Sequence, residues 1–110
     1  MSVPLVITTA FESRVDAEII AAALLEKRLI ACAQITGPVS SSYWWQGKVV
    51  SSAEYLLVMK SDESLYNELE QLIRDLHPYE TPEIIGTVIS HLSEEYRQWL
   101  EKELRRYRDE

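Results

Sequence analysis

The sequence has few of the residues that mark extracellular or membrane-spanning proteins. It contains one cysteine, Cys32, so no disulfide can form within the chain, and chains without disulfides are typical of reducing compartments. Its longest apolar run, residues 19–25, is far shorter than the roughly 20 residues needed to span a bilayer. No charged-then-apolar leader precedes Val3. We therefore expect a cytoplasmic protein that does not span a membrane.

Glycine and basic residues are also scarce. With three glycines the chain has no G-x-G-x-x-G pattern and no P-loop, so no backbone cradle for a nucleotide phosphate is evident. The chain has 11 Lys and Arg residues and 18 Asp and Glu residues, which gives a net charge of −7. Nucleic-acid backbones attract basic surfaces, so this balance argues against a nucleic-acid partner. An acidic surface concentrates cations, although plain solubility is the simpler explanation of the charge.

The chain is long enough for one domain, residues 1–110, and too short for two cores. Runs of β-branched and apolar residues predict strands, and apolar residues at helical spacing predict helices. The predicted strands are residues 3–9, 29–36 resuming through 43–45, 49–60 and 83–90. The predicted helices begin at the capping residues Ser13, Ser61 or Asp62, and Ser93. The first ends near Arg28, and Pro78 ends the second.

Each predicted helix has an apolar stripe that we expect to face the core. The stripes are Val15, Ile19, Ala22 and Ala23 in the first helix, Leu65, Leu69, Leu72, Ile73 and Leu76 in the second, and Tyr96, Trp99, Leu100, Leu104 and Tyr107 in the third. Asp16, three residues after Ser13, indicates a capping box at the start of the first helix.

The second and third strands form one long hairpin. Gln46-Gly47 is the turn, because glycine accepts positive φ without strain. A hairpin of this length does not stay flat, because strands twist. We therefore expect Gly37-Pro38 to bend one arm and Ser51-Ser52 to form a bulge in the other. The aromatic residues 43–45 lie near its tip.

The order β-α-β-β-α-β, followed by a helix, predicts an α+β fold: a ferredoxin-like sandwich with an extra C-terminal helix and a long hairpin. Right-handed crossovers place the first two helices on one face of a four-stranded antiparallel sheet. No predicted helix covers the other face of the sheet. Residues 29–35 and 55–59 are nevertheless apolar on both sides of their strands, which is typical of strands buried on both faces. An apolar sheet face that no helix of the same chain covers predicts contact with another chain, so we expect an oligomer. The alternative is a monomer sealed by the third helix and the bent hairpin.

Residues 77–85, HPYETPEII, contain the best candidate for a metal ligand. His77 follows a helix, on a connector stiffened by two prolines, with Tyr79 and Glu80 beside it. Imidazole and carboxylate are common metal ligands. The alternative is structural, because a histidine at a helix C-terminus also interacts with the open carbonyls and the dipole. Glu83 is a further carboxylate in the same segment.

Cys32 lies in a strand among alanines, where a small core residue is the default and a site role is the alternative. A catalytic thiol would need a nearby base and an orienting group. The sequence shows no such activated nucleophile, so we expect a protein that is not an enzyme.

Four blocks in order resemble the CutA family of divalent-cation tolerance proteins. They are residues 26–33 (EKRLIACA), residues 42–48 (SYWWQGK) followed by Glu54 and Lys60, residues 77–84 (HPYETPEI), and Tyr96 with Trp99. The resemblance extends from the first strand to about Leu104. It implies a homotrimer similar to nitrogen-regulatory PII proteins, with the long hairpin reaching a neighbouring subunit.

The resemblance also implies a ligand site. Some bacterial members bind copper through a first-strand cysteine and a His-His pair, whereas this chain has Thr8 and Leu76-His77 at those positions. His77 and Glu80 are then the metal-ligand candidates. An intersubunit cleft is expected to gather Cys32, Tyr43, Trp45, Lys60, His77, Tyr79 and Glu80.

The sequence thus favours a non-enzymatic, trimeric CutA-like protein that binds divalent cations weakly, copper above others, and acts in metal-ion response without an obligatory cofactor. One alternative is a PII-like sensor that binds a small anion or metabolite near Lys60. Another is a trimeric assembly platform for a different protein.

Overall fold

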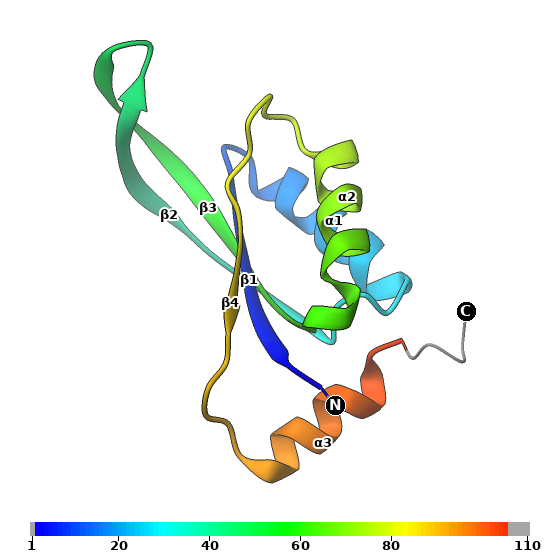
Figure 1. Cartoon of the computed structure of the whole chain (residues 1–110). Helices are drawn as coiled ribbons and strands as arrows, with labels where there is room; N and C mark the ends of the chain where they lie inside the picture. The colour runs from blue at the N-terminus through cyan, green and yellow to red at the C-terminus, as the bar shows by residue number, and fades with distance from the viewer. Residues whose placement is uncertain (1, 106–110) are drawn as a thin grey trace.

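The computed structural model describes residues 2–105. The elements in chain order are β1 (Pro4–Phe11), α1 (Arg14–Glu26), β2 (Cys32–Trp45), β3 (Lys48–Asp62), a 3₁₀ turn (Glu63–Leu65), α2 (Tyr66–Leu76), β4 (Ile84–Val88) and α3 (Glu94–Glu103). The four strands form one antiparallel sheet in the order β2-β3-β1-β4. This is the predicted ferredoxin-like arrangement, with α1 and α2 on one face of the sheet (Figure 1).

The local signals placed several boundaries correctly. Asp62 accepts a hydrogen bond from the amide of Ser64 and so caps the 3₁₀ turn that leads into α2. α2 ends at Leu76, before Pro78, as the steric restriction ahead of proline requires. The Ser93 side chain accepts from the amide of Tyr96 at the start of α3. Ser13 precedes α1 but makes no side-chain capping bond, so the predicted capping box is wrong.

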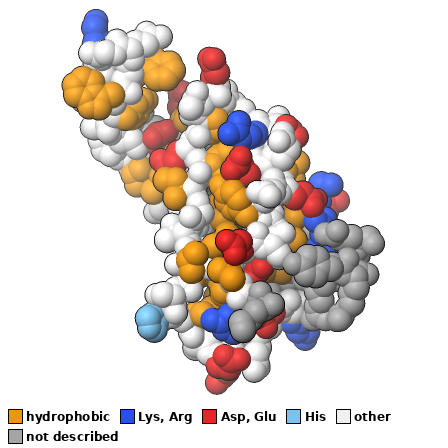
Figure 2. Space-filling model, viewed as in Figure 1, with side chains coloured by type: hydrophobic (Ala, Val, Ile, Leu, Met, Phe, Trp, Pro, Cys, Tyr) orange, Lys and Arg blue, Asp and Glu red, His pale blue; other side chains and the backbone are white. Residues whose placement is uncertain are grey.

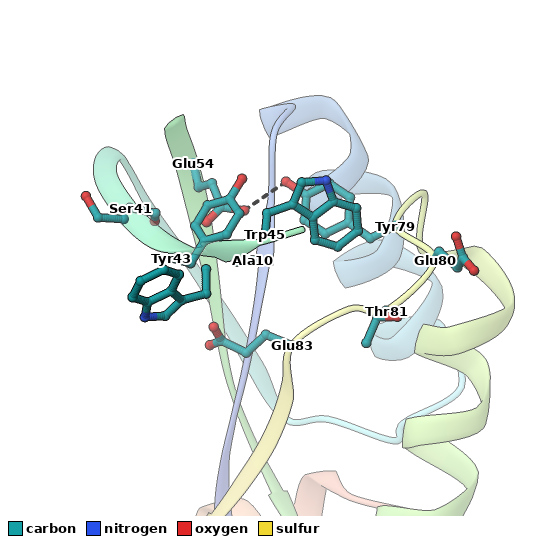
Figure 3. Close-up of a pocket in the computed structure, with 11 residues that line it drawn as sticks. Ala10, Ser41, Tyr43, Trp45, Glu54, Tyr79, Glu80, Thr81 and Glu83 are labelled. Atoms are coloured by element: carbon teal, nitrogen blue, oxygen red, sulfur yellow. Dashed lines mark hydrogen bonds between the residues drawn. The ribbon is translucent and has the colours of Figure 1, made fainter. Parts of the chain in front are cut away.

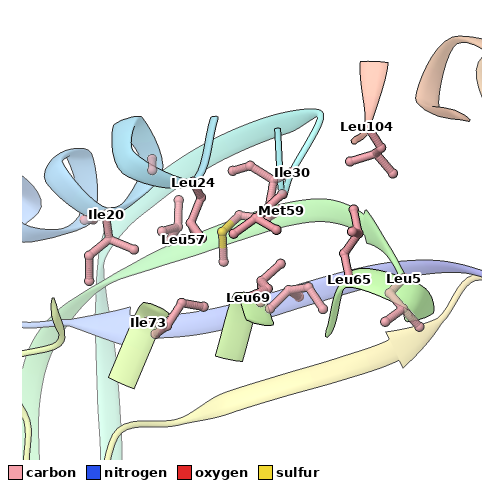
Figure 4. Packing of buried hydrophobic residues seen from close by; sticks show 14 of the residues in the cluster. Leu5, Ile20, Leu24, Ile30, Leu57, Met59, Leu65, Leu69, Ile73 and Leu104 are labelled. Atoms are coloured by element: carbon pink, nitrogen blue, oxygen red, sulfur yellow. The ribbon is translucent and has the colours of Figure 1, made fainter. Parts of the chain in front are cut away.

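The core lies between the sheet and the two helices. Figure 4 shows its packing, to which α1 contributes Ile20 and Leu24, α2 contributes Leu69 and Ile73, and β3 contributes Leu57 and Met59. α3 packs at one end of the sheet, where Leu100 and Leu104 join this cluster. Tyr107 lies outside the described residues.

The predicted inner face of α1 is wrong. Val15 and Ile19 are 58% and 55% exposed, whereas Ala17, Ile20 and Leu24 are fully buried. α1 is apolar on both sides, so two stripes compete in its sequence, and contact with the sheet selects the one that contains Ile20. Two other stripe residues, Leu76 in α2 and Trp99 in α3, are 44% and 41% exposed.

The β2–β3 hairpin projects from the body of the molecule (Figure 1). Its turn at Gln46 and Gly47 has positive φ at both residues, as predicted. The register shifts between Thr36 and Val39, where Gly37 has φ +145°, so one arm bends where expected. Ser51 and Ser52 pair regularly with Ser42 and Ser41, so the bulge predicted in the other arm is wrong.

The sheet face opposite α1 and α2 carries the side chains that alternate with the core residues. Val6, Lys60 and Cys32 are in register across three strands, and so are Thr8, Val58 and Gln34. We call this surface the open sheet face. The chain also exposes Trp44 and Trp45 on the hairpin and Ile85 on β4, and Figure 2 shows apolar side chains gathered near the hairpin tip.

Candidate cation-binding pocket

A pocket of about 740 Å³ lies where the hairpin meets the connector between α2 and β4. The hairpin supplies residues 41–45, β3 supplies Glu54, the end of β1 supplies Ala10, and the connector supplies Tyr79, Glu80, Thr81 and Glu83 (Figure 3). The bend at Gly37 is close to this pocket, because a β-carbon built there would lie 2.9 Å from the Glu54 carbonyl oxygen. Only glycine fits that contact, so Gly37 sets how the hairpin leaves the sheet and where its aromatic residues lie.

His77 connects the floor of this pocket to the body of the protein. Its Nδ1 accepts a hydrogen bond from the Tyr79 amide at 3.1 Å, so Nε2 carries the proton and donates to the Ala10 carbonyl oxygen at 2.9 Å. The ring stacks on Phe11 with centroids 4.3 Å apart. With both nitrogens bonded to backbone, His77 has no lone pair for a metal in this conformation. These contacts are the ones that the structural alternative expects, and the ligand role of His77 stays a prediction.

Tyr79 and Glu54 form the polar contact at the back of the pocket. The Tyr79 hydroxyl donates to Glu54 Oε2 at 2.8 Å. Burial, followed by this bond to the Glu54 carboxylate, raises the pKa of Tyr79 well above its ordinary value, so the phenol stays protonated as the donor. Glu54 is only 8% exposed, which is unusual for an acidic residue.

The electrostatic character of the pocket is acidic. Glu54, Glu80 and Glu83 line it, and no Lys, Arg or His of residues 2–105 does. The carboxylates do not converge, because within the described chain no three His, Cys, Asp or Glu side chains lie close enough together to hold a metal ion. The pocket therefore favours cations in general but is not a preformed metal centre in one chain.

The structure divides the predicted cleft residues into two groups. Tyr43, Trp45, Tyr79 and Glu80 line the pocket. His77 does not line it but forms hydrogen bonds with two residues that do, Ala10 and Tyr79. Cys32 and Lys60 lie on the open sheet face, six positions along β3 from Glu54, which is about 20 Å of strand. One chain therefore does not bring all seven residues together.

The second group is a small polar cluster of its own. Lys60 Nζ donates to Gln34 Oε1 at 3.0 Å and lies 4.0 Å from Cys32 Sγ. The Tyr96 hydroxyl is 3.6 Å from the same sulfur. Burial and the neighbouring Cys32 raise the pKa of Tyr96 to about 12. Cys32 is partly exposed and is not an enclosed core residue.

Sequence reasoning did not place Glu54 in the pocket or Gln34 and Tyr96 in the Lys60 cluster. A signal existed for Glu54, because it is an acidic residue within a predicted strand and strands are poor in Glu unless it has a role. Gln34 and Tyr96 could not be found that way, since their proximity depends on strand register and on where α3 docks.

Acidification is expected to destabilise the protein through His77. Burial lowers the pKa of His77 in the folded state, whereas the unfolded chain has the ordinary value of about 6.5. The unfolded state therefore binds more protons, so the stability due to neutral His77 is complete above about pH 6.5 and is lost as pH falls through the folded-state pKa. Urea unfolding midpoints measured from about pH 8 down to about pH 5 should fall accordingly.

Two histidine variants make this test specific. His77→Gln should flatten the dependence on pH in that window, and His91→Gln, which changes the exposed second histidine, should leave it as in the unmodified protein. An unchanged slope in His77→Gln would contradict the assignment.

The topology and the pocket define a small α+β protein of the ferredoxin-like class with an acidic aromatic pocket beside a long hairpin. The family model described as "CutA1 divalent ion tolerance protein" matches residues 5–103, and the chain belongs to this family. The family is thus described by tolerance of divalent ions and not by an enzymatic reaction. None of the helices in the described part of the chain is long and apolar enough to cross a membrane.

Relatives of the chain agree with this assignment. The divalent-cation tolerance protein CutA of Pyrococcus horikoshii is 35% identical over 93% of this chain and 99% of its own length. That of Thermus thermophilus is 42% identical over 76% of this chain and 82% of its own. A solved structure of the Thermus thermophilus protein superposes with a TM-score of 0.89 at 37% identity, covering 92% of this chain and 98% of that one.

Proposed function

We propose that this CutA-family protein binds divalent cations weakly and acts in the response to metal ions, with copper as the preferred ion. One observation carries the proposal: the pocket beside the hairpin is lined by three carboxylates and by no basic side chain of residues 2–105. The relatives named above are divalent-cation tolerance proteins, which supports the proposal of cation binding. We place this activity in the cytoplasm, because Cys32 is a free thiol.

Of the predicted pair His77 and Glu80, we keep Glu80 and propose Glu83 as the second ligand. His77 is committed to backbone hydrogen bonds, so Glu80 and Glu83, both exposed to solvent, are the accessible ligands. Binding through dispersed carboxylates and water is weak, which suits a protein that responds to excess metal. For a given set of ligands, the affinity for divalent ions rises to a maximum at Cu²⁺, so copper remains the preferred ion.

We further propose that the protein is a homotrimer. The open sheet face carries the half-buried Val6 and Val58, and Ile85 on β4 is 51% exposed. Contiguous apolar surface is typical of interfaces. Trp44 is 75% exposed at the hairpin tip, where an aromatic residue suits an anchor on a neighbouring subunit. In such an assembly the open face of one subunit meets elements of another. A trimer has three times the 12.7 kDa mass of the chain, which light scattering measures directly.

Lys60 supports a second candidate, a sensor for a small anion. Its ammonium group lies on the open sheet face with the polar groups of Gln34 and Tyr96 nearby, and this cluster is separate from the acidic pocket. Saturable binding of inorganic phosphate, lost in Lys60→Gln and kept in Glu83→Gln, would support it. No phosphate binding would remove this candidate.

Calorimetric titration with Cu²⁺, compared with Zn²⁺ and Mg²⁺, tests the metal proposal. We expect saturable Cu²⁺ binding near micromolar, about −8 kcal/mol. Glu80→Gln and Glu83→Gln should each weaken it about fivefold, because a close charge pair in a water-like dielectric contributes about 1 kcal/mol. The control Glu26→Gln changes an exposed carboxylate at the far end of α1 and should have no effect. No saturable heat, or equal effects in all three variants, would contradict the proposal.

A further inference from the structure

We propose that the same pocket binds a linear diamine or polyamine, which is a flexible methylene chain carrying two or more ammonium groups. This inference goes beyond the proposed function, which concerns metal ions. The two proposals share Glu80 and Glu83, but this one also needs the aromatic rings and the buried carboxylate of Glu54, which the metal proposal does not use as ligands. Variants of Trp45 therefore separate the two.

Aromatic side chains are the first observation. Tyr43, Trp44, Trp45 and Tyr79 all line the pocket, and Figure 3 shows rings from the hairpin and the connector around the same space. In the single chain Trp45 is 53% exposed, so its ring can contact a ligand in the pocket while Trp44 at the tip contacts a neighbouring subunit. Ring faces attract alkylammonium groups through cation–π interaction and cover apolar methylenes. A hydrated metal ion gains little from such a wall, whereas an alkyl amine gains from both effects.

The buried carboxylate of Glu54 is the second observation. It is 8% exposed, yet within residues 2–105 its only hydrogen-bond donor is the neutral phenol of Tyr79. No basic side chain of that part of the chain forms an ion pair with it. A largely buried carboxylate is stabilised by a cation beside it. An ammonium group entering the pocket would supply both the positive charge and N–H donors for the unoccupied oxygen.

The separation of the carboxylates is the third observation. Glu54, Glu80 and Glu83 come from a strand and from two places on the connector (Figure 3), and they do not form a cluster that one metal ion could contact. An extended ligand with several charges can reach more than one of them. A volume of about 740 Å³ is within the usual range for small-molecule sites.

Titration with spermidine, putrescine and Mg²⁺, followed by calorimetry at fixed salt, tests the inference. We expect saturable binding in the order spermidine, putrescine, Mg²⁺. Trp45→Leu and Glu54→Gln should each weaken spermidine at least fivefold, and Trp45→Leu should leave Cu²⁺ binding unchanged. Trp99→Leu changes an exposed tryptophan on α3, outside the pocket, and should have no effect. Circular dichroism verifies that every variant is folded.

The remaining outcomes overturn the inference. If spermidine binds no better than Mg²⁺, or if Trp45→Leu matches Trp99→Leu while Glu54→Gln is also without effect, then only general charge attraction is present. If the unmodified protein does not bind spermidine but an obligate monomeric variant does, the occupant of the pocket is a basic side chain of a second copy. Spermidine binding without Cu²⁺ binding would leave this inference standing and remove the metal proposal.

Discussion

Replacing Phe11 by alanine is expected to lower the free energy of unfolding by about 3–5 kcal/mol, the range for large-to-small changes of a buried aromatic residue. Phe11 is fully buried, and its ring stacks on His77 at a centroid distance of 4.3 Å. The cavity would therefore remove core contacts and the support of the imidazole that holds the connector to β1 through Ala10. Chemical denaturation at one fixed protein concentration measures the loss, since the stability of an oligomer depends on concentration.

The same variant should also weaken cation binding, because Tyr79 follows His77 by two residues and would lose its position beside Glu54. Phe11→Leu is the matched control: it keeps most of the buried volume, and we expect a loss below about 1.5 kcal/mol. A loss below about 1 kcal/mol in Phe11→Ala would show that this ring is not an essential part of the core.

Replacing Val58 by lysine is expected to convert the proposed homotrimer to single chains. Val58 lies on the open sheet face between Thr8 and Gln34, where a covering subunit would bury the new ammonium group without a partner. Such burial costs several kcal/mol, and a symmetric trimer repeats that cost in each subunit. Light scattering should show the mass falling from about three times 12.7 kDa to that of one chain.

Val15→Lys is the matched control, because it makes the same change on the exposed side of α1. It should leave the mass at that of a trimer. A trimer that survives Val58→Lys would place the interface elsewhere than on the open sheet face. A monomeric mass for the unmodified protein would contradict the trimer itself.

Much of the fold could be predicted because its signals are local. The turn at Gln46-Gly47, the end of α2 before Pro78 and the cap at Ser93 each depend on the conformational preferences of one or two residues. The order of elements follows from those boundaries, and the order leads to the sheet topology through the handedness of crossovers. The bend at Gly37-Pro38 was predictable for the same reason.

The candidate site was predictable only in part. Tyr43, Trp45, Tyr79 and Glu80 do share one pocket, whereas Cys32 and Lys60 belong to another cluster. Sequence indicates which residue types are present and where they lie along each strand. It does not show that both nitrogens of His77 are bonded to backbone, since one of those partners, Ala10, is 67 residues away.

The amino-acid sequence by itself determined the element order, the turns, the acidic character and the CutA family, because these depend on composition, spacing and neighbouring residues. Tertiary structure decided three things that spacing left open: which side of the doubly apolar helix α1 faces the sheet, which face of the sheet stays open, and which backbone groups the two ring nitrogens of His77 contact. Each depends on contacts between residues far apart in the chain, which form only when strand register and helix docking bring them together.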